Sequence, residues 1–365
     1  SEMLKPRTML RTDVIDHCKE AFLIDILLKL PKGWEKEVQV YDEFTAVNGA
    51  AGVTYVDKMN RNTSAGFPWN KSKKNFLSPW KGEEYLDCVE LNDEIKLRID
   101  SIFEKYDSKT RYCPVYAGNL KDEPISEEKA KINKVRLFAG APIDYIVAVR
   151  MYYLSLIRLI QNNRFIFETG VGTVAQSNQW GDILRELRKK PSKNGVNGDF
   201  RFYDKTNMPS MILAAFWILI ELSKKAGFTE KDTCRMWGMA YDSAYPFMNF
   251  NGDLVEWFCS LPSGHPLTVI INGLCNSLFM RYAYTINNPK HTCWDFQEDV
   301  VLVTYGDDNI MTVSDSAPFF NHTTIQNTLN EIGIIYTMAD KETESIPYIP
   351  LEECSFLKRT WVYNS

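Results

Sequence analysis

The chain has 365 residues, 45% hydrophobic and 24% charged, which is typical of a globular protein large enough for more than one subdomain. Its formal net charge of -5 excludes a globally basic nucleic-acid binder but allows a local basic channel. The eight cysteines lack a Cys-x-x-Cys spacing and the four histidines are scattered, so the sequence shows neither a disulfide framework nor a zinc pattern. The longest apolar run, 211–220, is too short to span a bilayer.

The first predicted element is a helix over residues 14–30, which ends at a Pro-Lys-Gly breaker. The following region is rich in loops. In it, Ser64 and Gly66 stand beside an aromatic pair and precede Lys73 and Lys74, a combination that suits a loop following the backbone of single-stranded nucleic acid. Taken alone, this stretch is better explained as a solvated turn.

A mixed-charge surface helix is predicted over residues 83–105, and an apolar core helix over 145–160. Between them, the segment from Lys129 to Arg136 carries four basic residues, Lys131 and Lys134 included, and no acidic one. An extended segment of this kind could hold a triphosphate, although a charge run is more often a solvated face.

Two aspartates frame the next turn. Asp199 ends a short strand pattern, and Asp204 follows five residues later. Asn207 is expected to cap the apolar helix that begins at Pro209. The two carboxylates are either a metal ligand with a hydrogen-bond acceptor, or ordinary turn and cap chemistry.

A loop around Pro262 and Gly264 then leads into an apolar helix over residues 267–284. Thr268 and Asn272 are four residues apart and therefore share one face of this helix. Asn272 needs a partner there, which could be a backbone carbonyl, the Asp204 side chain or a ribose hydroxyl. His265, beside a proline, is interpreted as structural.

Residues 300–313 predict a β-hairpin. Two apolar strands surround Gly306, which can take a positive φ, and Asp307 and Asp308 stand at the tip. Two adjacent carboxylates repel each other, and a divalent cation with oxygen ligands would relieve that repulsion. The alternative, a plain polar turn, is equally compatible with this stretch alone.

The last predicted elements are a helix over residues 323–332, ended by Gly333, and a strand over 334–338. Lys341 follows, in a place where a lone lysine is normally a surface residue. A short strand pattern over residues 354–359 ends in Lys358 and Arg359.

In order and spacing, these motifs resemble those of the RNA-dependent RNA polymerases of positive-strand RNA viruses, in the picornavirus-like superfamily and nearest to its dicistrovirus and marnavirus members. The resemblance covers nearly the whole chain. The matching motifs are Asp199 with Asp204; Ser263-Gly264 with Thr268 and Asn272; Tyr305-Gly306-Asp307-Asp308; Asp340-Lys341; Phe356-Leu357-Lys358-Arg359; and, upstream, residues 63–68 and 121–136.

The resemblance implies an α+β right-hand polymerase with an antiparallel palm sheet backed by helices. We expect fingers in residues 1–150, palm in 151–239, an insertion between fingers and palm in 240–262, and palm again in 263–365. The family's thumb is expected to be absent, which would make this chain a fragment of a longer polymerase.

The resemblance also implies a function, which is template-directed RNA synthesis from rNTPs with two Mg²⁺ ions, or Mn²⁺ in their place. Asp199 and Asp307 would hold the metals with Asp308 in support, and Lys341 would protonate the leaving pyrophosphate. The expected nucleotide ligands are Lys129, Lys134, Arg136, Asp204, Ser263, Thr268 and Asn272. The expected RNA contacts are Ser64, Gly66, Lys73, Lys74, Gly264, Lys358 and Arg359.

The implied partners are an RNA template and primer, and other viral replication proteins cut from the same polyprotein. The implied location is the host cytoplasm, at membrane-associated replication complexes. Two alternatives stay open. Tyr203 beside Asp204 keeps a reverse transcriptase possible, because such enzymes usually block the 2′-hydroxyl with an aromatic residue. A non-catalytic RNA-binding scaffold is the other, although it would have no need of four clustered carboxylates.

Overall fold

The structure is a computed structural model that describes residues 9–82, 87–121, 124, 127, 131, 135–190 and 193–361. The chain forms two compact units. Unit 1 consists of Ser1–Trp34, Leu159–Leu219 and Val269–Ser365, and unit 2 consists of Glu35–Arg158 and Ile220–Thr268. The chain passes from one unit to the other within η2 (Trp34–Glu37), α5 (Ile143–Asn162) and α8 (Pro209–Lys225) and at the start of α10 (Thr268–Asn287), so continuous helices cross the limits of the units.

Unit 1 is built on a four-stranded antiparallel sheet with the strand order β10-β5-β9-β8. The predicted hairpin is confirmed, since Tyr305 pairs with Asp308 across a turn in which Gly306 has a φ of 62°. The strands of this sheet are β5 (Asn194–Phe200), β8 (Val300–Tyr305), β9 (Asp308–Val313) and β10 (Tyr336–Met338).

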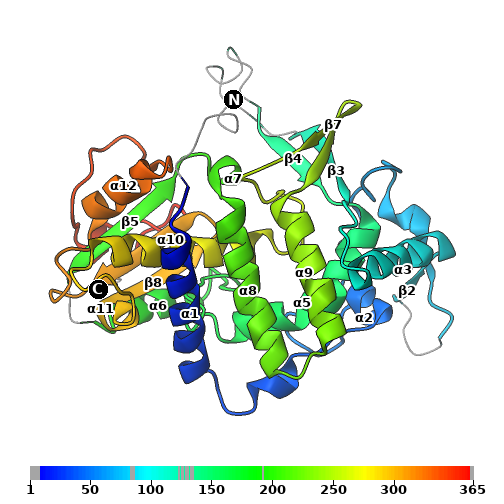
Figure 1. Cartoon of the computed structure of the whole chain (residues 1–365), viewed down its shortest axis with the longest axis horizontal. Helices are drawn as coiled ribbons and strands as arrows, with labels where there is room; N and C mark the ends of the chain where they lie inside the picture. The colour runs from blue at the N-terminus through cyan, green and yellow to red at the C-terminus, as the bar shows by residue number, and fades with distance from the viewer. Residues whose placement is uncertain are drawn as a thin grey trace. The chain divides into compact units, whose positions relative to one another are not determined.

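Helices accompany this sheet in unit 1 (Figure 1). The helix predicted over 267–284 is confirmed as α10, which is buried along most of its length, as its apolar sequence requires. The bounds are α1 (Thr12–Lys29), α6 (Gln179–Leu187), α7 (Tyr203–Thr206), α10 (Thr268–Asn287), α11 (Phe296–Asp299), α12 (His322–Glu331) and the short 3-10 helix η4 (Leu351–Glu353), with α8 (Pro209–Lys225) divided between the units.

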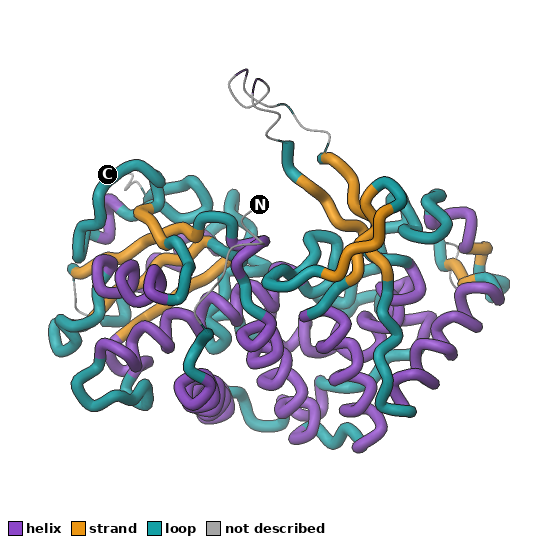
Figure 2. The backbone as a smooth tube through the Cα atoms, turned by 45° about the horizontal axis from the view of Figure 1, so that its top comes forward, coloured by secondary structure: helices purple, strands orange, loops and turns teal. Residues whose placement is uncertain are grey.

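Unit 2 contains a second four-stranded sheet, ordered β4-β3-β6-β7, in which β3 and β6 run parallel and the other pairs antiparallel. Figure 2 shows β3 and β4 as a long ribbon. The strands of unit 2 are β1 (Leu77–Pro79), β2 (Val89–Leu91), β3 (Val115–Leu120), β4 (Leu137–Gly140), β6 (Phe247–Phe250) and β7 (Asp253–Glu256). Its helices are η2 (Trp34–Glu37, which begins in unit 1), α2 (Glu43–Asn48), η3 (Lys73–Phe76), α3 (Asp93–Asp107), α5 (Ile143–Asn162, which ends in unit 1) and α9 (Glu230–Ala244).

Two sequence predictions are corrected. The helix expected over 83–105 begins only at Asp93, because β2 precedes it and the Asn92 side chain caps it by accepting from the Ile95 N–H at 3.1 Å. Part of that range, residues 83–86, lies outside the described residues. The strand expected over 354–359 is instead a tight turn between Phe356 and Arg359. No described helix is both long and apolar enough to cross a membrane.

A buried ion cluster connects the hairpin to the rest of unit 1. Arg281 on α10 is fully buried and holds Glu168 through two hydrogen bonds, of 2.7 and 2.8 Å, and Asp25 through one of 3.0 Å. The Glu168 backbone oxygen in turn accepts from both the backbone N–H and the hydroxyl of Thr304 on β8, at 2.8 and 2.9 Å. The position of β8 therefore depends on a buried guanidinium that is held by two carboxylates.

We expect Arg281→Ala to lower the free energy of unfolding by about 3–5 kcal/mol, because it leaves the Glu168 carboxylate buried without its cation. Chemical denaturation monitored by circular dichroism would measure this loss. Arg185→Ala is the matched control, since Arg185 pairs with Asp182 at an exposed position, where an ion pair contributes about 0–1 kcal/mol. Equal losses in the two variants would contradict the anchoring role of Arg281.

Candidate active site

The carboxylates of unit 1 gather at one end of its sheet. Gly198 on β5 lies opposite Asn309 on β9, so the next residue of β5, Asp199, reaches the end of the sheet where the Asp307-Asp308 turn lies. The Asp199 side chain is largely buried, and Asp308 is half-buried. Neighbouring antiparallel strands thus bring together carboxylates that are more than a hundred residues apart in the sequence.

Burial and neighbouring carboxylates raise the pKa values of the two aspartates in the turn. The Asp307 side chain reaches solvent at the turn, but partial burial together with the nearby Asp199 raises its pKa. Burial, with Asp307 and Asp199 beside it, raises the pKa of Asp308 to about 6. A site that concentrates negative charge in this way disfavours its own ionised form unless a cation enters.

Lys341 supplies the positive charge that the structure places here. Its ammonium forms an ion pair with Asp199 and lowers the pKa values of Asp307 and Asp308. Lys341 stands three residues beyond the end of β10 and has a φ of 68°, in the left-handed region, while the Asp340 carboxylate accepts from the Glu342 and Thr343 N–H groups. Lys341 is exposed, as expected for a lysine after a strand, yet it belongs to the carboxylate cluster.

A divalent cation fits the chemistry of this donor set, which consists of carboxylate oxygens whose mutual repulsion it would relieve. Asp199, Asp307 and Asp308 are the residues that would hold it. Among the described residues, no group of three or more His, Cys, Asp or Glu side chains is already arranged to hold a metal ion, so a bound cation would have to draw these carboxylates closer together.

A second group of side chains lies where α7 approaches α10. Tyr203 is buried and its hydroxyl donates to the Asn272 backbone oxygen at 2.9 Å. The Asn207 amide donates to the Asn272 side-chain oxygen at 3.3 Å, a different contact from the helix cap expected for it. Asp204 is exposed. The side-chain partner of Asn272 is therefore Asn207, and not one of the three partners expected from the sequence.

In unit 2, the Ser263-Gly264 loop is fixed on β4. The Ser263 hydroxyl accepts from the Ala139 N–H at 3.1 Å, and the Gly264 N–H donates to the Ala139 oxygen at 2.8 Å. A Cβ on Gly264 would lie 2.3 Å from that oxygen, so only glycine fits. The Thr268 hydroxyl lies 2.8 Å from the backbone oxygens of Pro262 and His265, which uses its proton within the loop.

His265 is a structural residue, as predicted. Its Nδ1 accepts from the Leu267 N–H at 3.0 Å, so Nε2 carries the proton and donates to the Ser243 hydroxyl at 2.9 Å. Complete burial lowers its pKa to about 3, which keeps the ring neutral.

The loop expected to follow RNA has one lysine that faces inward. Lys73 is buried and donates to the Thr63 hydroxyl at 2.7 Å, and burial lowers its pKa to about 8. Lys74 is exposed. Gly66 has a φ of 78° and accepts no side chain, because a Cβ would lie 2.8 Å from the Ala141 oxygen, and the Ser64 hydroxyl accepts from the Gly66 N–H at 3.1 Å. Lys73 therefore stabilises the loop itself.

The structure describes only part of the basic segment from 129 to 136. Lys129 and Lys134 lie outside the described residues. Arg136 stands exposed directly before β4, and its backbone oxygen accepts from the Lys121 N–H at 2.8 Å, which extends the pairing of β3 with β4.

Lys358 and Arg359 belong to the turn that the structure forms where a strand was expected over residues 354–359. Leu357 and Lys358 have φ values of 51° and 59°, and Phe356 and Arg359 exchange two backbone hydrogen bonds of 2.9 and 3.0 Å. Both cations are exposed, and a hydrogen bond from the Leu357 backbone lowers the pKa of Asp308. The turn thus touches the carboxylate cluster through its backbone.

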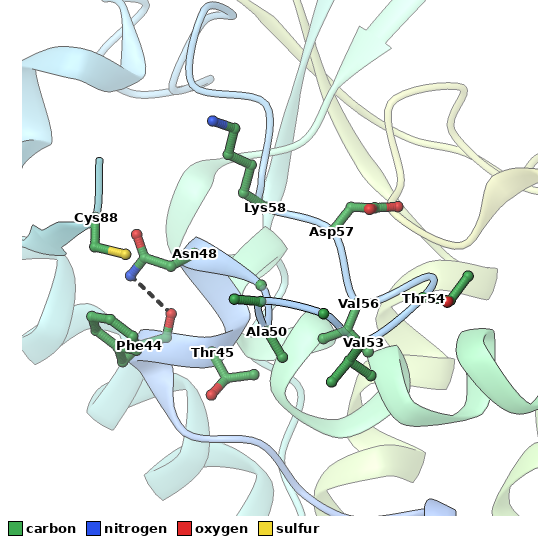
Figure 3. A pocket seen from close by; sticks show the side chains of 13 residues that line it. Phe44, Thr45, Asn48, Ala50, Val53, Thr54, Val56, Asp57, Lys58 and Cys88 are labelled. Carbon is green, nitrogen blue, oxygen red and sulfur yellow. Dashed lines mark hydrogen bonds between the residues drawn. The ribbon is translucent and has the colours of Figure 1, made fainter. Parts of the chain in front are cut away.

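A cavity of about 650 Å³ lies elsewhere, in unit 2, between α2 and the loop that follows it (Figure 3). Its labelled side chains include Asn48, Thr54, Lys58 and Cys88. None of its lining residues is a predicted site residue.

Comparison with known proteins decides the family. Residues 21–365 match the family described as viral RNA-dependent RNA polymerase. The chain belongs to this family. It is 28% identical over 350 residues to the replicase polyprotein of Drosophila C virus (strain EB), and 28% identical over 369 residues to that of Acute bee paralysis virus (strain Rothamsted). These alignments cover 90% and 95% of this chain but only 19% of either polyprotein.

The fold comparison agrees with the polymerase family. The structure is similar to that of the Sicinivirus 3Dpol RNA dependent RNA polymerase, with a TM-score of 0.80 and 17% sequence identity, over 98% of this chain and 70% of that one. The resemblance stated from the motifs is therefore confirmed, and so are the sheets and helices of the mixed fold.

Sequence reasoning missed several polar residues of this polymerase-family site. Asn276 lies one helical turn beyond Asn272, and its side chain donates to the backbone of the Asp307-Asp308 turn. Asn309 and Tyr336 continue this contact. The signal that could have found Asn276 is a second asparagine on the same face of an otherwise apolar helix.

Removing a carboxylate charge should stabilise the metal-free protein. Because the folded-state pKa of Asp308 lies above its ordinary value of 3.8, the folded state keeps a proton that the unfolded state releases, and stability is lost as pH rises from about 4 to about 6. We expect Asp308→Asn to reduce this loss and to raise Tm at pH 7, by about 1–2 °C for each kcal/mol of repulsion relieved.

Differential scanning calorimetry with a chelator present, at pH 4.5 and pH 7, would measure the effect. Glu331→Gln, at an exposed carboxylate that ends α12, is the control for charge removal alone. A Tm at pH 7 that is lower in Asp308→Asn than in the unchanged protein would disprove the repulsion argument.

Proposed function

We propose that this chain carries out template-directed synthesis of RNA from rNTPs. The observation that supports this most strongly is the meeting of Asp199 on β5 with Asp307 and Asp308 at the β8–β9 turn, in a chain that belongs to the viral polymerase family. The sheet of unit 1 would be the palm, and unit 2 would contribute the fingers. Divalent metal ions, when bound, would neutralise charge on the primer 3′-hydroxyl and the leaving pyrophosphate.

The residues of this chain would divide the work as follows. Asp199 and Asp307 would hold Mg²⁺, with Mn²⁺ as a substitute, and Asp308 would support them. Lys341 would donate a proton to the leaving pyrophosphate once its ion pair with Asp199 is released. Lys129, Lys134 and Arg136 would bind the triphosphate, and the exposed Lys74, Lys358 and Arg359 would bind RNA phosphates.

The ribose would be recognised by hydrogen bonds. Asn272 and Asp204 would bind its hydroxyls, with Ser263 assisting. Tyr203 does not support the reverse transcriptase alternative, because its ring is buried and its hydroxyl is bonded to the Asn272 backbone. The scaffold alternative is also disfavoured, since a scaffold has no use for a carboxylate cluster that raises the pKa values of Asp307 and Asp308.

The proposed partners are an RNA template and primer, and replication proteins from the same polyprotein, as the polyprotein relatives suggest. The proposed location, membrane-associated replication complexes in the host cytoplasm, follows from the family resemblance.

Primer extension on a self-priming RNA with labelled rNTPs and Mg²⁺ would test the proposal. We expect extension by the unchanged chain and its loss in Asp307→Ala, because that variant removes a metal-binding carboxylate. If the unchanged chain binds RNA equally well with and without Mg²⁺ and never extends the primer, even within a longer segment of its polyprotein, the scaffold reading replaces the polymerase.

Sugar selection gives a second prediction. Asn272→Ala should loosen discrimination against dNTPs more than it slows rNTP incorporation, because the 2′-hydroxyl would lose its polar partner. The ratio of kcat/KM for an rNTP and the matching dNTP is the measurement. An unchanged ratio would remove Asn272 from the ribose site, and Asn287→Ala, at an asparagine near the other end of α10, is the control.

A further inference from the structure

We infer that Asn276, Asn309 and Tyr336 form a chain of positioning residues that sets the geometry of the Asp307-Asp308 turn and thereby its affinity for divalent metal. The inference deepens the proposed function and rests on it, because it concerns the same carboxylates. The hydrogen bonds that link these three residues to the turn do not involve a carboxylate oxygen, so the residues would act through the backbone of the turn.

The first link is Asn276. Its side chain is fully buried, and its Nδ2 lies 3.1, 3.0 and 3.3 Å from the backbone oxygens of Gly306, Asp307 and Asp308. The two N–H bonds of the Asn276 amide are thus shared among three consecutive carbonyl oxygens, and this one amide occupies the inside of the turn. The directions of the Asp307 and Asp308 side chains are fixed by the backbone that this amide holds.

The next links fix the amide itself. Asn309 Nδ2 donates to Asn276 Oδ1 at 3.2 Å, and the Tyr336 hydroxyl donates to Asn309 Oδ1 at 2.7 Å. Each member donates to the next, so only one orientation of each amide satisfies all the bonds. Because Asn309 and Tyr336 are also buried, a broken link would leave an unpaired polar group out of reach of water.

Gly198 makes the chain possible. Tyr336 lies on β10 and Asn309 on β9, and β5 runs between these two strands. Gly198 on β5 pairs with Asn309, and a Cβ at this position would lie 2.1 Å from Tyr336 Cζ and 2.2 Å from its hydroxyl oxygen. The missing side chain leaves the space through which the tyrosine crosses β5.

This chain of hydrogen bonds therefore runs past each of the proposed catalytic residues. It begins on β10, three residues beyond which Lys341 stands. It crosses β5 beside Asp199, passes through β9 next to Asp308, and ends on α10, one turn beyond Asn272. Residues that orient metal ligands in this indirect way typically change metal affinity or activity 10–100-fold when they are replaced.

Two variants test whether Asn276, Asn309 and Tyr336 act as positioning residues. Asn276→Leu keeps the approximate volume and removes the amide, and Tyr336→Phe removes only the hydroxyl. We expect Asn276→Leu to raise the Mg²⁺ concentration for half-maximal primer extension by about 10-fold or more. Tyr336→Phe should shift it less in the same direction, and KM for the rNTP at saturating Mg²⁺ should stay close to that of the unchanged protein.

A measurement without substrate separates the inference from the proposed activity. The rise of Tm on titration with Mg²⁺ reports metal binding directly, and its midpoint should shift to higher Mg²⁺ in both variants. If the unchanged chain extends no primer, the proposed function fails, and the Tm midpoints still decide whether Asn276 and Tyr336 set metal affinity.

Matched controls separate positioning from simple loss of a buried bond. Asn287→Leu removes an amide from the same helix that donates to the Ala283 oxygen and the Thr328 hydroxyl, both at 2.8 Å. Tyr153→Phe removes a buried hydroxyl that donates to the Met236 oxygen at 2.9 Å. Both controls should lower stability and leave the Mg²⁺ midpoint unchanged.

The inference is overturned if Tyr336→Phe and Asn276→Leu lose only stability, as the controls do, with an unchanged Mg²⁺ midpoint. If Asn276→Leu does not fold, Tyr336→Phe alone carries the test, because the loss of one hydroxyl leaves the packing of the ring in place. Gly198→Ala, which displaces the Tyr336 ring, should shift the midpoint in the same direction.

Discussion

The repulsion among Asp199, Asp307 and Asp308 is the constraint on which the rest of unit 1 depends. A sheet can hold carboxylates this close only if its strands cannot relax apart, and the raised pKa values of Asp307 and Asp308 show that charge repulsion and burial both act there. The surrounding structure opposes this relaxation from two sides. Arg281 and Glu168 hold β8 through Thr304, and Asn276 holds the turn itself. The repulsion among the carboxylates thus lowers the stability of unit 1, and the hydrogen bonds of Arg281, Thr304 and Asn276 offset this loss.

The way in which this support is built suits metal binding. Thr304, Asn309 and Asn276 are polar residues that are buried among the apolar residues of unit 1. Their bonds, however, go to backbone oxygens and to each other, whereas an apolar residue could not fix the rotation of a turn. Because Asn276 uses the backbone carbonyls, it leaves the carboxylate oxygens of Asp307 and Asp308 available. Directional support of this kind favours one conformation of the turn over others of similar energy.

The sequence predicted the parts of this arrangement that are local. The apolar strands, Gly306 and the two aspartates identify the hairpin, and the end of a strand pattern identifies Asp199. The links between them are long-range contacts, such as Tyr336 with Asn309 across Gly198, and no spacing rule reveals them. The turn at Leu357 was missed for a related reason, since Phe356 packs against Trp180, which is far away in the sequence.

On the ribose side of the proposed site, a buried partner likewise fixes the orientation of a side chain that would bind the ligand. An asparagine amide can present either a donor or an acceptor to a ligand, and the choice decides what it recognises. Because Asn207 donates to Asn272 Oδ1, the Nδ2 group of Asn272 is the part of the amide left for a ligand. In the proposed site, a 2′-hydroxyl that accepts from this N–H would still have its own proton to donate, and Asp204 is the acceptor that we propose for it. A deoxyribose offers neither contact, so the orientation that Asn207 imposes would turn a general polar contact into one that selects for ribose.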